Sequence, residues 1–191
     1  MNTSEFDKLT RKLVSPLLEG EYDFLFSDGT YYKELPNKVR QVVTFDLDMK
    51  KGSTFRVMLG VNSSIITGSA SPTEAGVFGL KYLSENGLAF MPSNFPCFNE
   101  DLATKSLTKI VKILTSGPLA WLLAVDTIEK AANLAEEQYP FIKGKLYLVA
   151  GQTNKAKQYF AQHLAYLVKL PESSQVVEAI RETQKLLQLC V

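Results

Sequence analysis

Residues 22–62 alternate between apolar and polar positions, and a period of two predicts β-strands. Four runs are separated by turn residues, and Asp28-Gly29 between the first two predicts a tight hairpin, because such a turn needs positive φ. In the third and fourth runs the apolar residues share one face: Val43, Phe45, Leu47, Met49, Phe55, Val57, Leu59 and Val61. Asp46, Asp48 and Arg56 fall on the opposite face. The pattern therefore predicts four consecutive antiparallel strands with one buried and one solvent-exposed face.

Before and after the predicted sheet segment, apolar residues recur at helical spacing. From Ser4 to Leu18 they recur every three or four positions, which predicts a helix that covers the buried face. Pro72 opens a second predicted helix, which runs to about Leu83. An irregular stretch, Leu88–Phe98, comes next. The remaining predicted helices are one capped by Asn99 and broken at 116–118, one over 119–138, a short one ending at Ala150, one over 154–170, and a last one capped by Ser173 or Ser174.

These elements together predict an α+β fold. Its N-terminal helix lies on a four-stranded antiparallel β-meander, and a C-terminal all-helical bundle follows. We expect residues 1–191 to form a single compact domain, since no flexible linker separates its parts. In this interpretation residues 1–62 supply the helix and sheet, and residues 72–191 supply the helical part that packs on or beside them.

Composition narrows the class of protein more than its function. The chain has 191 residues, 46% hydrophobic and 21% charged, which is typical of globular proteins. A net charge of +1 gives no strong nucleic-acid signal. Cys97 and Cys190 lie far apart, as reduced structural cysteines do, and the longest near-apolar stretch, 118–125, is too short to span a bilayer. The first residues lack a secretory signal. We therefore expect a cytoplasmic protein with no membrane segment and no cofactor.

One helical hairpin near the C-terminus carries a more specific pattern. Gly144, Tyr147, Gly151 and Ala156 stand at the spacing of a tetratricopeptide-type repeat, in which a glycine ends the first helix and the alanine lets the two helices approach closely. His163 is a departure, because the repeat has a small residue there. Only one copy is present, whereas about three are needed for a peptide groove, so a packed helix pair is the simpler interpretation.

The meander and this hairpin together resemble a widespread bacterial family known only as a domain of unknown function. The resembling segments are Phe24-Leu25-Phe26, Tyr31-Tyr32, Val42-Val43, Phe55-Arg56-Val57-Met58-Leu59-Gly60 and the turn from Gly151 to Ala156. The resemblance implies a helix that leads into a β-meander, followed by C-terminal helices. Proteins similar in this way look like immunity or antitoxin-type partners of secreted toxins. The resemblance implies no catalytic residues.

Asp46-Leu47-Asp48-Met49-Lys50 is the sharpest enzymatic candidate. Metal-dependent nucleases place an acid and a lysine two positions apart on a strand, with an earlier aspartate, here Asp28. The carboxylates then hold Mg²⁺, and the lysine orients the attacking water. The same charges also suit the solvated tip of a hairpin, where they oppose aggregation. Both interpretations stay open.

The residue inventory disfavours other catalytic sites. His163 is the only histidine, so a histidine-rich metal site is excluded, and a Ser-His-Asp or Cys-His arrangement would have to use it. Its place in the middle of a predicted helix, on or beside an apolar face, is typical of a packing histidine. The sequence has no phosphate-binding glycine-rich loop.

Two sets of charged residues are candidate binding surfaces. The first is the polar sheet face with Asp46, Asp48 and Arg56. The second is the segment 138–171, which carries no acidic residue and whose candidate contacts are Lys143, Lys145, Lys155 and Lys157. Such a segment would steer an acidic partner, unless the acidic residues just before it balance its charge: Glu129, Glu136 and Glu137.

Three hypotheses for function follow. The leading one is a non-enzymatic protein that binds another protein, of the immunity or antitoxin type that the resemblance implies, and blocks its partner by steric occlusion. Because the chain is nearly neutral, we expect such a toxin not to be highly basic. One alternative is a divalent-metal-dependent nuclease that uses Asp28, Asp46, Asp48 and Lys50. The other is a domain that binds a small ligand in an apolar pocket beneath Leu88–Phe98. The sequence does not indicate an oligomeric state.

Overall fold

The structure is a computed structural model that describes residues 2–36, 38–48, 54–63, 78–135 and 137–190. Its chain divides into two compact units, Met1–Val125 and Asp126–Val191. The division falls inside the predicted helical part, so residues 100–123 belong with the sheet. The expectation that the whole chain forms a single compact domain stays a prediction.

The first helix begins at a side-chain cap. In α1 (Thr3–Leu18) the Asn2 side chain accepts a hydrogen bond from the Glu5 N–H at 2.9 Å, and the Glu5 carboxylate accepts one from the Asn2 N–H. This capping box satisfies N–H groups that have no partner within the helix. One side of α1 is buried: Phe6, Leu9, Thr10, Val14, Leu17 and Leu18. The predicted N-terminal helix is confirmed.

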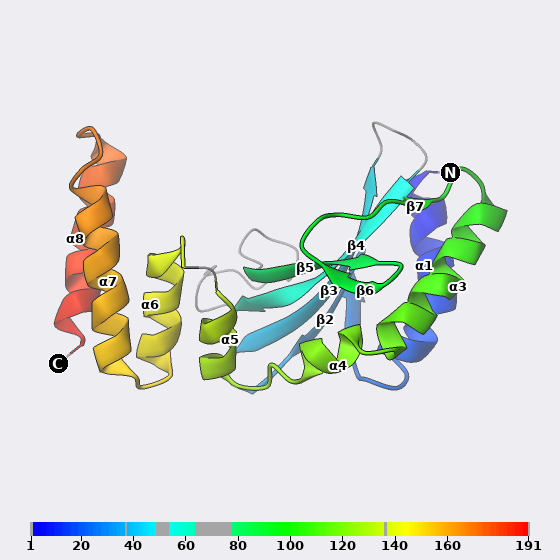
Figure 1. Ribbon diagram of the computed structural model, residues 1–191, viewed down its shortest axis with the longest axis horizontal. Helices are drawn as coiled ribbons and strands as arrows, with labels where there is room; N and C mark the ends of the chain where they lie inside the picture. The colour runs from blue at the N-terminus through cyan, green and yellow to red at the C-terminus, as the bar shows by residue number, and fades with distance from the viewer. Residues whose placement is uncertain (1, 37, 49–53, 64–77, 136, 191) are drawn as a thin grey trace. The chain divides into compact units, whose positions relative to one another are not determined.

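Four consecutive antiparallel strands follow, as predicted: β1 (Leu25–Ser27), β2 (Thr30–Glu34), β3 (Val39–Asp48) and β4 (Thr54–Ser63). Asp28 and Gly29 form the two-residue turn between β1 and β2, with φ of 47° and 74°. Positive φ at both turn positions matches the right-handed twist of the strands. Figure 1 shows β3 and β4 as the long central strands of the sheet.

The sheet is larger than predicted. β5 (Phe78–Ser84) pairs with β4, β6 (Gly87–Ala89) pairs with β5, and β7 (Phe95–Pro96) pairs with the first residues of β4. The helix predicted from Pro72 to Leu83 is thus wrong over residues 78–83, while residues 72–77 lie outside the described residues. The reason is tertiary: β5 supplies hydrogen-bond partners for the edge of β4, which is buried at Leu59 and Val61.

The core of the N-terminal unit lies between one face of the sheet and two helices, α1 and α3 (Glu100–Thr115), which pack on each other (Figure 1). Aromatic rings join the layers. The ring centroids of Phe6 on α1 and Phe55 on β4 lie 4.8 Å apart, and those of Phe55 and Phe95 lie 5.7 Å apart. The apolar face predicted for the third and fourth strands is therefore the face that the helices cover, and of its predicted residues Met49 lies outside the described residues.

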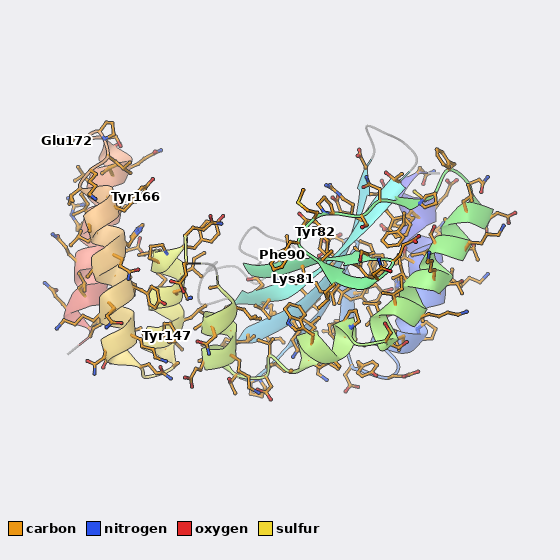
Figure 2. All side chains as sticks on the ribbon, in the orientation of Figure 1. Lys81, Tyr82, Phe90, Tyr147, Tyr166 and Glu172 are labelled. Atoms are coloured by element: carbon orange, nitrogen blue, oxygen red, sulfur yellow. The ribbon has the colours of Figure 1, made fainter. Side chains whose placement is uncertain are left out.

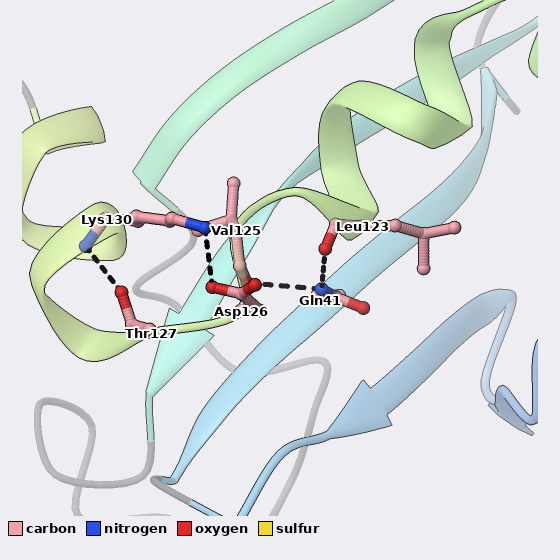
Figure 3. Close-up of polar contacts among 6 residues, drawn as sticks. All are labelled: Gln41, Leu123, Val125, Asp126, Thr127 and Lys130. Carbon is pink, nitrogen blue, oxygen red and sulfur yellow. Dashed lines mark hydrogen bonds and ion pairs between the residues drawn. The ribbon is translucent and has the colours of Figure 1, made fainter.

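A buried glutamine ties the short helix α4 (Pro118–Leu123) to β3. The Gln41 side-chain amide donates hydrogen bonds to the carbonyl oxygens of Leu123 and Val125, at 3.3 and 3.1 Å (Figure 3). Only 1% of Gln41 is exposed, so these bonds replace those that water would make. The carbonyls of Leu123, the last residue of α4, and of Val125, which follows the helix, are thereby satisfied away from solvent.

The opposite face of the sheet is only partly solvent-exposed. Asp46 and Arg56 lie opposite each other on β3 and β4 and form an ion pair, with 37% and 35% of their side chains exposed. Further along the same face, Arg40, Val42 and Asn62 are buried. The prediction that this whole face is solvent-exposed is therefore wrong at the end with Arg40. There Arg40 pairs with the Glu34 carboxylate of β2 at 3.1 Å.

The C-terminal unit consists of helices that pack each on the next: α5 (Ile128–Leu134), α6 (Pro140–Val149), α7 (Thr153–Leu167) and α8 (Ser174–Gln188). The single helix predicted over 119–138 is wrong, because α4 and α5 are separate. Thr127 begins α5 by accepting a hydrogen bond from the Lys130 N–H at 3.2 Å (Figure 3). None of the described helices combines the length and the apolar character that a membrane span needs.

The α6–α7 hairpin has the close packing that its repeat-like spacing predicts. Gly144 lies within α6 against the Phe160 ring of α7, so that a β-carbon at Gly144 would be 2.5 Å from Cε1 of that ring. Gly151 follows α6 with φ of 74°, a conformation that favours glycine over other residues and ends the helix. Ala156 and Phe160 are fully buried between the helices of the unit.

Candidate functional site

The structure brings two of the predicted nuclease residues to one cleft. Asp28, at the turn after β1, and Asp46, on β3, both line a cavity of about 460 Å³ beside α1. Asp7 of α1 lines it as well, and sequence reasoning missed it because no local pattern relates α1 to the hairpin turn. Asp48 is not among the described residues that line this cavity, and Lys50 lies outside the described residues.

Of the carboxylates of this cleft, Asp46 is in an ion pair, and Asp7 is partly buried beside the negative charge of Asp28. Arg56 donates a hydrogen bond to the Asp46 carboxylate within the ion pair across the strands. Burial raises the pKa of Asp7, and the negative charge of Asp28 raises it further. Within the part of the chain that the structure describes, no three histidine, cysteine, aspartate or glutamate side chains are grouped so as to hold a metal ion. The set of converging ligands that the nuclease hypothesis requires is thus not assembled by these residues.

Three of the four lysines predicted to bind a partner form ion pairs inside the C-terminal unit. The pairs are Lys143 with Glu137 at 2.6 Å, Lys145 with Glu182 at 3.0 Å, and Lys155 with Glu129 at 3.7 Å. The second pair joins α6 to α8, and the third joins α7 to α5. Lys157 is exposed on α7. Glu129 and Glu137 thus balance part of the charge of the lysine-bearing segment, as the alternative interpretation holds, and Glu136 lies outside the described residues.

Each paired lysine also lies over an aromatic ring. The Nζ atoms of Lys143, Lys145 and Lys155 lie 5.1, 4.4 and 5.0 Å from the ring centroids of Tyr159, Phe141 and Tyr147. Ammonium groups are attracted to the faces of such rings. Tyr147, labelled in Figure 2, stacks on Tyr159 at 5.5 Å and donates a hydrogen bond to Asn133 at 2.6 Å. These lysines and rings together fix the positions of neighbouring helices.

His163 occupies a packing position. Its imidazole lies against the Phe141 ring, with centroids 4.9 Å apart. Burial lowers the pKa of His163, and the Glu182 carboxylate opposes that shift. The imidazole is therefore neutral at neutral pH, as a histidine that packs in a helix hairpin should be.

The stretch Leu88–Phe98 holds both buried and exposed aromatic residues. Phe95 is buried, whereas 81% of Phe90 and 58% of Phe98 are exposed. The Phe90 ring lies 3.3 Å from Nζ of Lys81, and both residues are labelled in Figure 2. A cavity of about 550 Å³ adjoins Phe98, and the other residues that line it are Glu5, Lys8, Leu9, Lys12, Asn99 and Glu100. This charged lining differs from the apolar pocket expected for a small ligand.

Sequence reasoning missed a cavity of about 500 Å³ in the C-terminal unit. It is lined by residues at the start of α6 and in the second half of α7, among them Tyr139, Phe141, His163 and Tyr166. Tyr139 and Tyr166 are 47% and 58% exposed. The available signal was the Tyr139-Pro140-Phe141 run at a helix start, but helical periodicity does not reveal that the rings beside it stay open to solvent.

The fold defines a class: an α+β protein with a mostly antiparallel sheet and a C-terminal unit of packed helices. Comparisons with known proteins do not narrow this class. No family model matches the chain, and no curated protein or solved structure matches it. The resemblance to a bacterial family of unknown function stays a prediction.

Proposed function

We propose that this chain is a non-enzymatic protein that binds another protein through its C-terminal helical unit. One observation carries the proposal: among the described residues, six of the ten exposed large apolar side chains belong to this shorter unit. They are Tyr139, Val149, Tyr166, Val168, Val177 and Leu189. Apolar side chains that stay exposed are available to contact a partner, and this unit has more of them than the longer N-terminal unit.

The charged residues predicted to contact a partner are mostly paired within the protein, which favours the exposed apolar side chains as the contact. Asp46 and Arg56 pair with each other, and the lysines pair with glutamates of their own unit, so that a partner would have to break these pairs to use their charges. The apolar side chains lose only water when they are covered. The contact is therefore made mainly by rings and aliphatic groups, with the charges at its margin.

The mode of action that fits a preformed helical surface is steric occlusion. Rigid helices that are tied by ion pairs and close packing lose little conformational freedom when they bind. A protein of the immunity or antitoxin type, which covers the active cleft of a toxin, works in this way. Such a role agrees with the proposed binding surface and requires no catalytic group in this chain.

Capture from native lysate with immobilised protein tests the proposal. The parent chain should retain a stoichiometric partner, and Tyr166→Ser should lose it, because that ring is exposed in the proposed surface. Leu25→Ser is the matched control: Leu25 is 59% exposed but lies on β1 in the other unit. No stoichiometric partner under any condition, or equal losses in the two variants, would contradict the proposal.

The toxin-neutralising role needs a separate test. The product of a gene adjacent to this one would be expressed alone and together with the chain in a host cell. If that product stops growth, co-expression of the parent chain should restore it, and co-expression of Tyr166→Ser should not. A captured partner with no toxic activity would leave the binding function standing and exclude the toxin-neutralising role.

A metal-dependent nuclease is kept as a second candidate because Asp28 and Asp46 line the same cleft. This hypothesis predicts Mg²⁺-dependent cleavage of DNA or RNA by the parent chain and none by Asp28→Ala. Asp23→Ala is the matched control, since Asp23 lies in the same segment but does not line the cleft. Absence of cleavage by the parent chain ends this candidate.

A further inference from the structure

The cavity of about 500 Å³ in the C-terminal unit has a wall made of aromatic rings. Tyr139 comes from the residue before α6, Phe141 from its first turn, and His163 and Tyr166 from α7. Figure 2 shows Tyr166 on α7. Tyr139 and Tyr166 are about half exposed, so both rings can contact a molecule that enters from solvent.

The inner part of this wall is preformed. The Phe141 ring packs on the Phe160 ring at 6.1 Å and on the His163 ring at 4.9 Å. Phe160 is itself fully buried against Gly144, which leaves it no room to move inward. A ligand would therefore meet rings that are already in place, which lowers the entropy lost on binding.

Among the described residues that line the cavity, Glu137 is the only one charged at neutral pH, and none of them is a lysine or an arginine. The hydrogen bond from Lys143 lowers the pKa of Glu137, so this carboxylate is ionised. Lys143 and Tyr159 both engage the Oε1 atom, which leaves Oε2 without a partner among the described residues. Lys143 offsets part of the negative charge, and Oε2 is the atom that can accept a new donor.

The C-terminal unit already contains several contacts between an ammonium group and the face of an aromatic ring. Lys143, Lys145 and Lys155 each place an ammonium group over an aromatic ring. Among the described residues, no cation lies over Tyr139 or Tyr166, although both residues are more exposed than the three of this unit whose rings carry one. These two rings are thus the ones still open to a cation from outside.

We propose that this cavity binds a lysine or arginine side chain presented by the partner protein. The inference rests on the proposed protein-binding function and names the chemistry of its contact. The aliphatic stem of such a side chain packs on the rings, its cationic group faces Tyr139 and Tyr166, and its N–H groups reach Oε2 of Glu137. An acidic side chain would meet the Glu137 carboxylate and the negative faces of the rings, and is excluded.

Titration of the isotope-labelled full chain with small probes, followed by NMR, tests the assignment. The probes are N-acetyl-arginine amide, N-acetyl-lysine amide and the uncharged N-acetyl-norleucine amide. The cationic probes should shift the signals of Tyr139, His163 and Tyr166 and bind more tightly than the norleucine probe. Tyr166→Ser should weaken cation binding by about 2–5-fold, the effect of removing one ring, while Leu25→Ser, exposed on β1 of the other unit, should not.

Acidity gives an independent readout, because protonation of His163 would place a positive charge in the cavity wall. The charged groups around it are Lys145 of α6, Glu182 of α8 and Glu137 at the rim. Cation binding should weaken as the pH falls below about 6.5, the ordinary pKa of histidine, because burial lowers the pKa of His163 from that value. His163→Gln should remove most of this dependence.

The outcomes separate this inference from the proposed function. Equal binding of the norleucine probe, or binding of N-acetyl-glutamate amide instead, would overturn the cation assignment. So would the absence of any shift at these residues. If Tyr166→Ser still loses the captured protein in that case, the protein-binding function stands and its contact at this cavity is apolar. If the cationic probes bind but no protein partner is captured, the proposed function fails on its own.

Discussion

Replacing Gly144 with alanine sets two measurable effects against each other. Alanine is favoured over glycine inside a helix by about 1 kcal/mol. The new β-carbon, however, would lie 2.5, 2.7 and 3.0 Å from Cε1, Cδ1 and Cζ of the Phe160 ring. That ring is fully buried and packs on Phe141, so it cannot turn into solvent to make room. Overpacking costs about 1–3 kcal/mol, and contacts this short belong in the upper part of that range. We expect a net loss of about 1–2 kcal/mol in the free energy of unfolding of the C-terminal unit.

Hydrogen exchange measured by mass spectrometry is the suitable assay. The single tryptophan, Trp121, belongs to the N-terminal unit, so its fluorescence would not follow the change. Peptides from α6 and α7 should exchange about 5–30-fold faster in Gly144→Ala, while peptides from the sheet keep the parent rate.

Two further variants make the interpretation of this experiment specific. Ala165→Gly, at an exposed position of α7, changes helix propensity alone and should cost about 1 kcal/mol. Adding Phe160→Leu to Gly144→Ala should cost less than the sum of the two single changes, because the smaller side chain makes room for the β-carbon. Exchange in Gly144→Ala as slow as in the parent would refute the reasoning, since it would mean that Phe160 yields freely.

Three further predictions concern the N-terminal unit. Gln41→Met should lower its stability by about 1–3 kcal/mol in urea unfolding followed by Trp121 fluorescence, because the carbonyls of Leu123 and Val125 lose buried donors; an unchanged midpoint would contradict this. Asp7→Asn should raise stability at pH 7 by up to about 0.5 kcal/mol, and the gain should vanish below about pH 4. The sign follows from the raised pKa of Asp7: its ionisation costs folding energy above the folded pKa and nothing below the unfolded one, so a gain that persists in acid would be inconsistent. Burial raises the pKa of Tyr31 to about 12, so the parent should lose stability as the pH rises from 10 to about 12, and Tyr31→Phe should lose less; parallel pH profiles would exclude this cause.

The parts of the fold that the sequence predicts are those fixed by local patterns. Alternating residues, the Asp28-Gly29 turn and the spacing of Gly144 and Ala156 each act on neighbours in the chain or on one helix pair. The strand β5 is different, because it forms only when it meets the edge of β4, and its residues have no strict alternation of their own. The break between α4 and α5 likewise depends on Thr127, a residue that caps a helix in one context and continues one in another.

The candidate site was harder to predict than the fold, because it depends on distances between segments. The nuclease hypothesis requires Asp28 and Asp46 to lie close together, and both line one cleft, because the turn with Asp28 leads into β2 and β2 pairs with β3. Asp7 joins them from α1, and no sequence spacing between a helix and a turn reveals that approach. The cavity beside Tyr139 and Tyr166 was missed for the same reason: exposure is a property of the packed unit.

The lysines of the C-terminal unit show why a charge count along the chain is a poor guide to recognition here. Segment 138–171 has five lysines and no acidic residue, yet in space three of its ammonium groups pair with glutamates that come before and after it. Lys145, for example, pairs with Glu182, which lies beyond the segment on α8. Long-range attraction of an acidic partner depends on net charge over distances of about 10 Å, and paired charges cancel over that distance. A partner of this unit is therefore selected at short range, by the fit of its side chains to exposed rings, and its association should depend only weakly on salt.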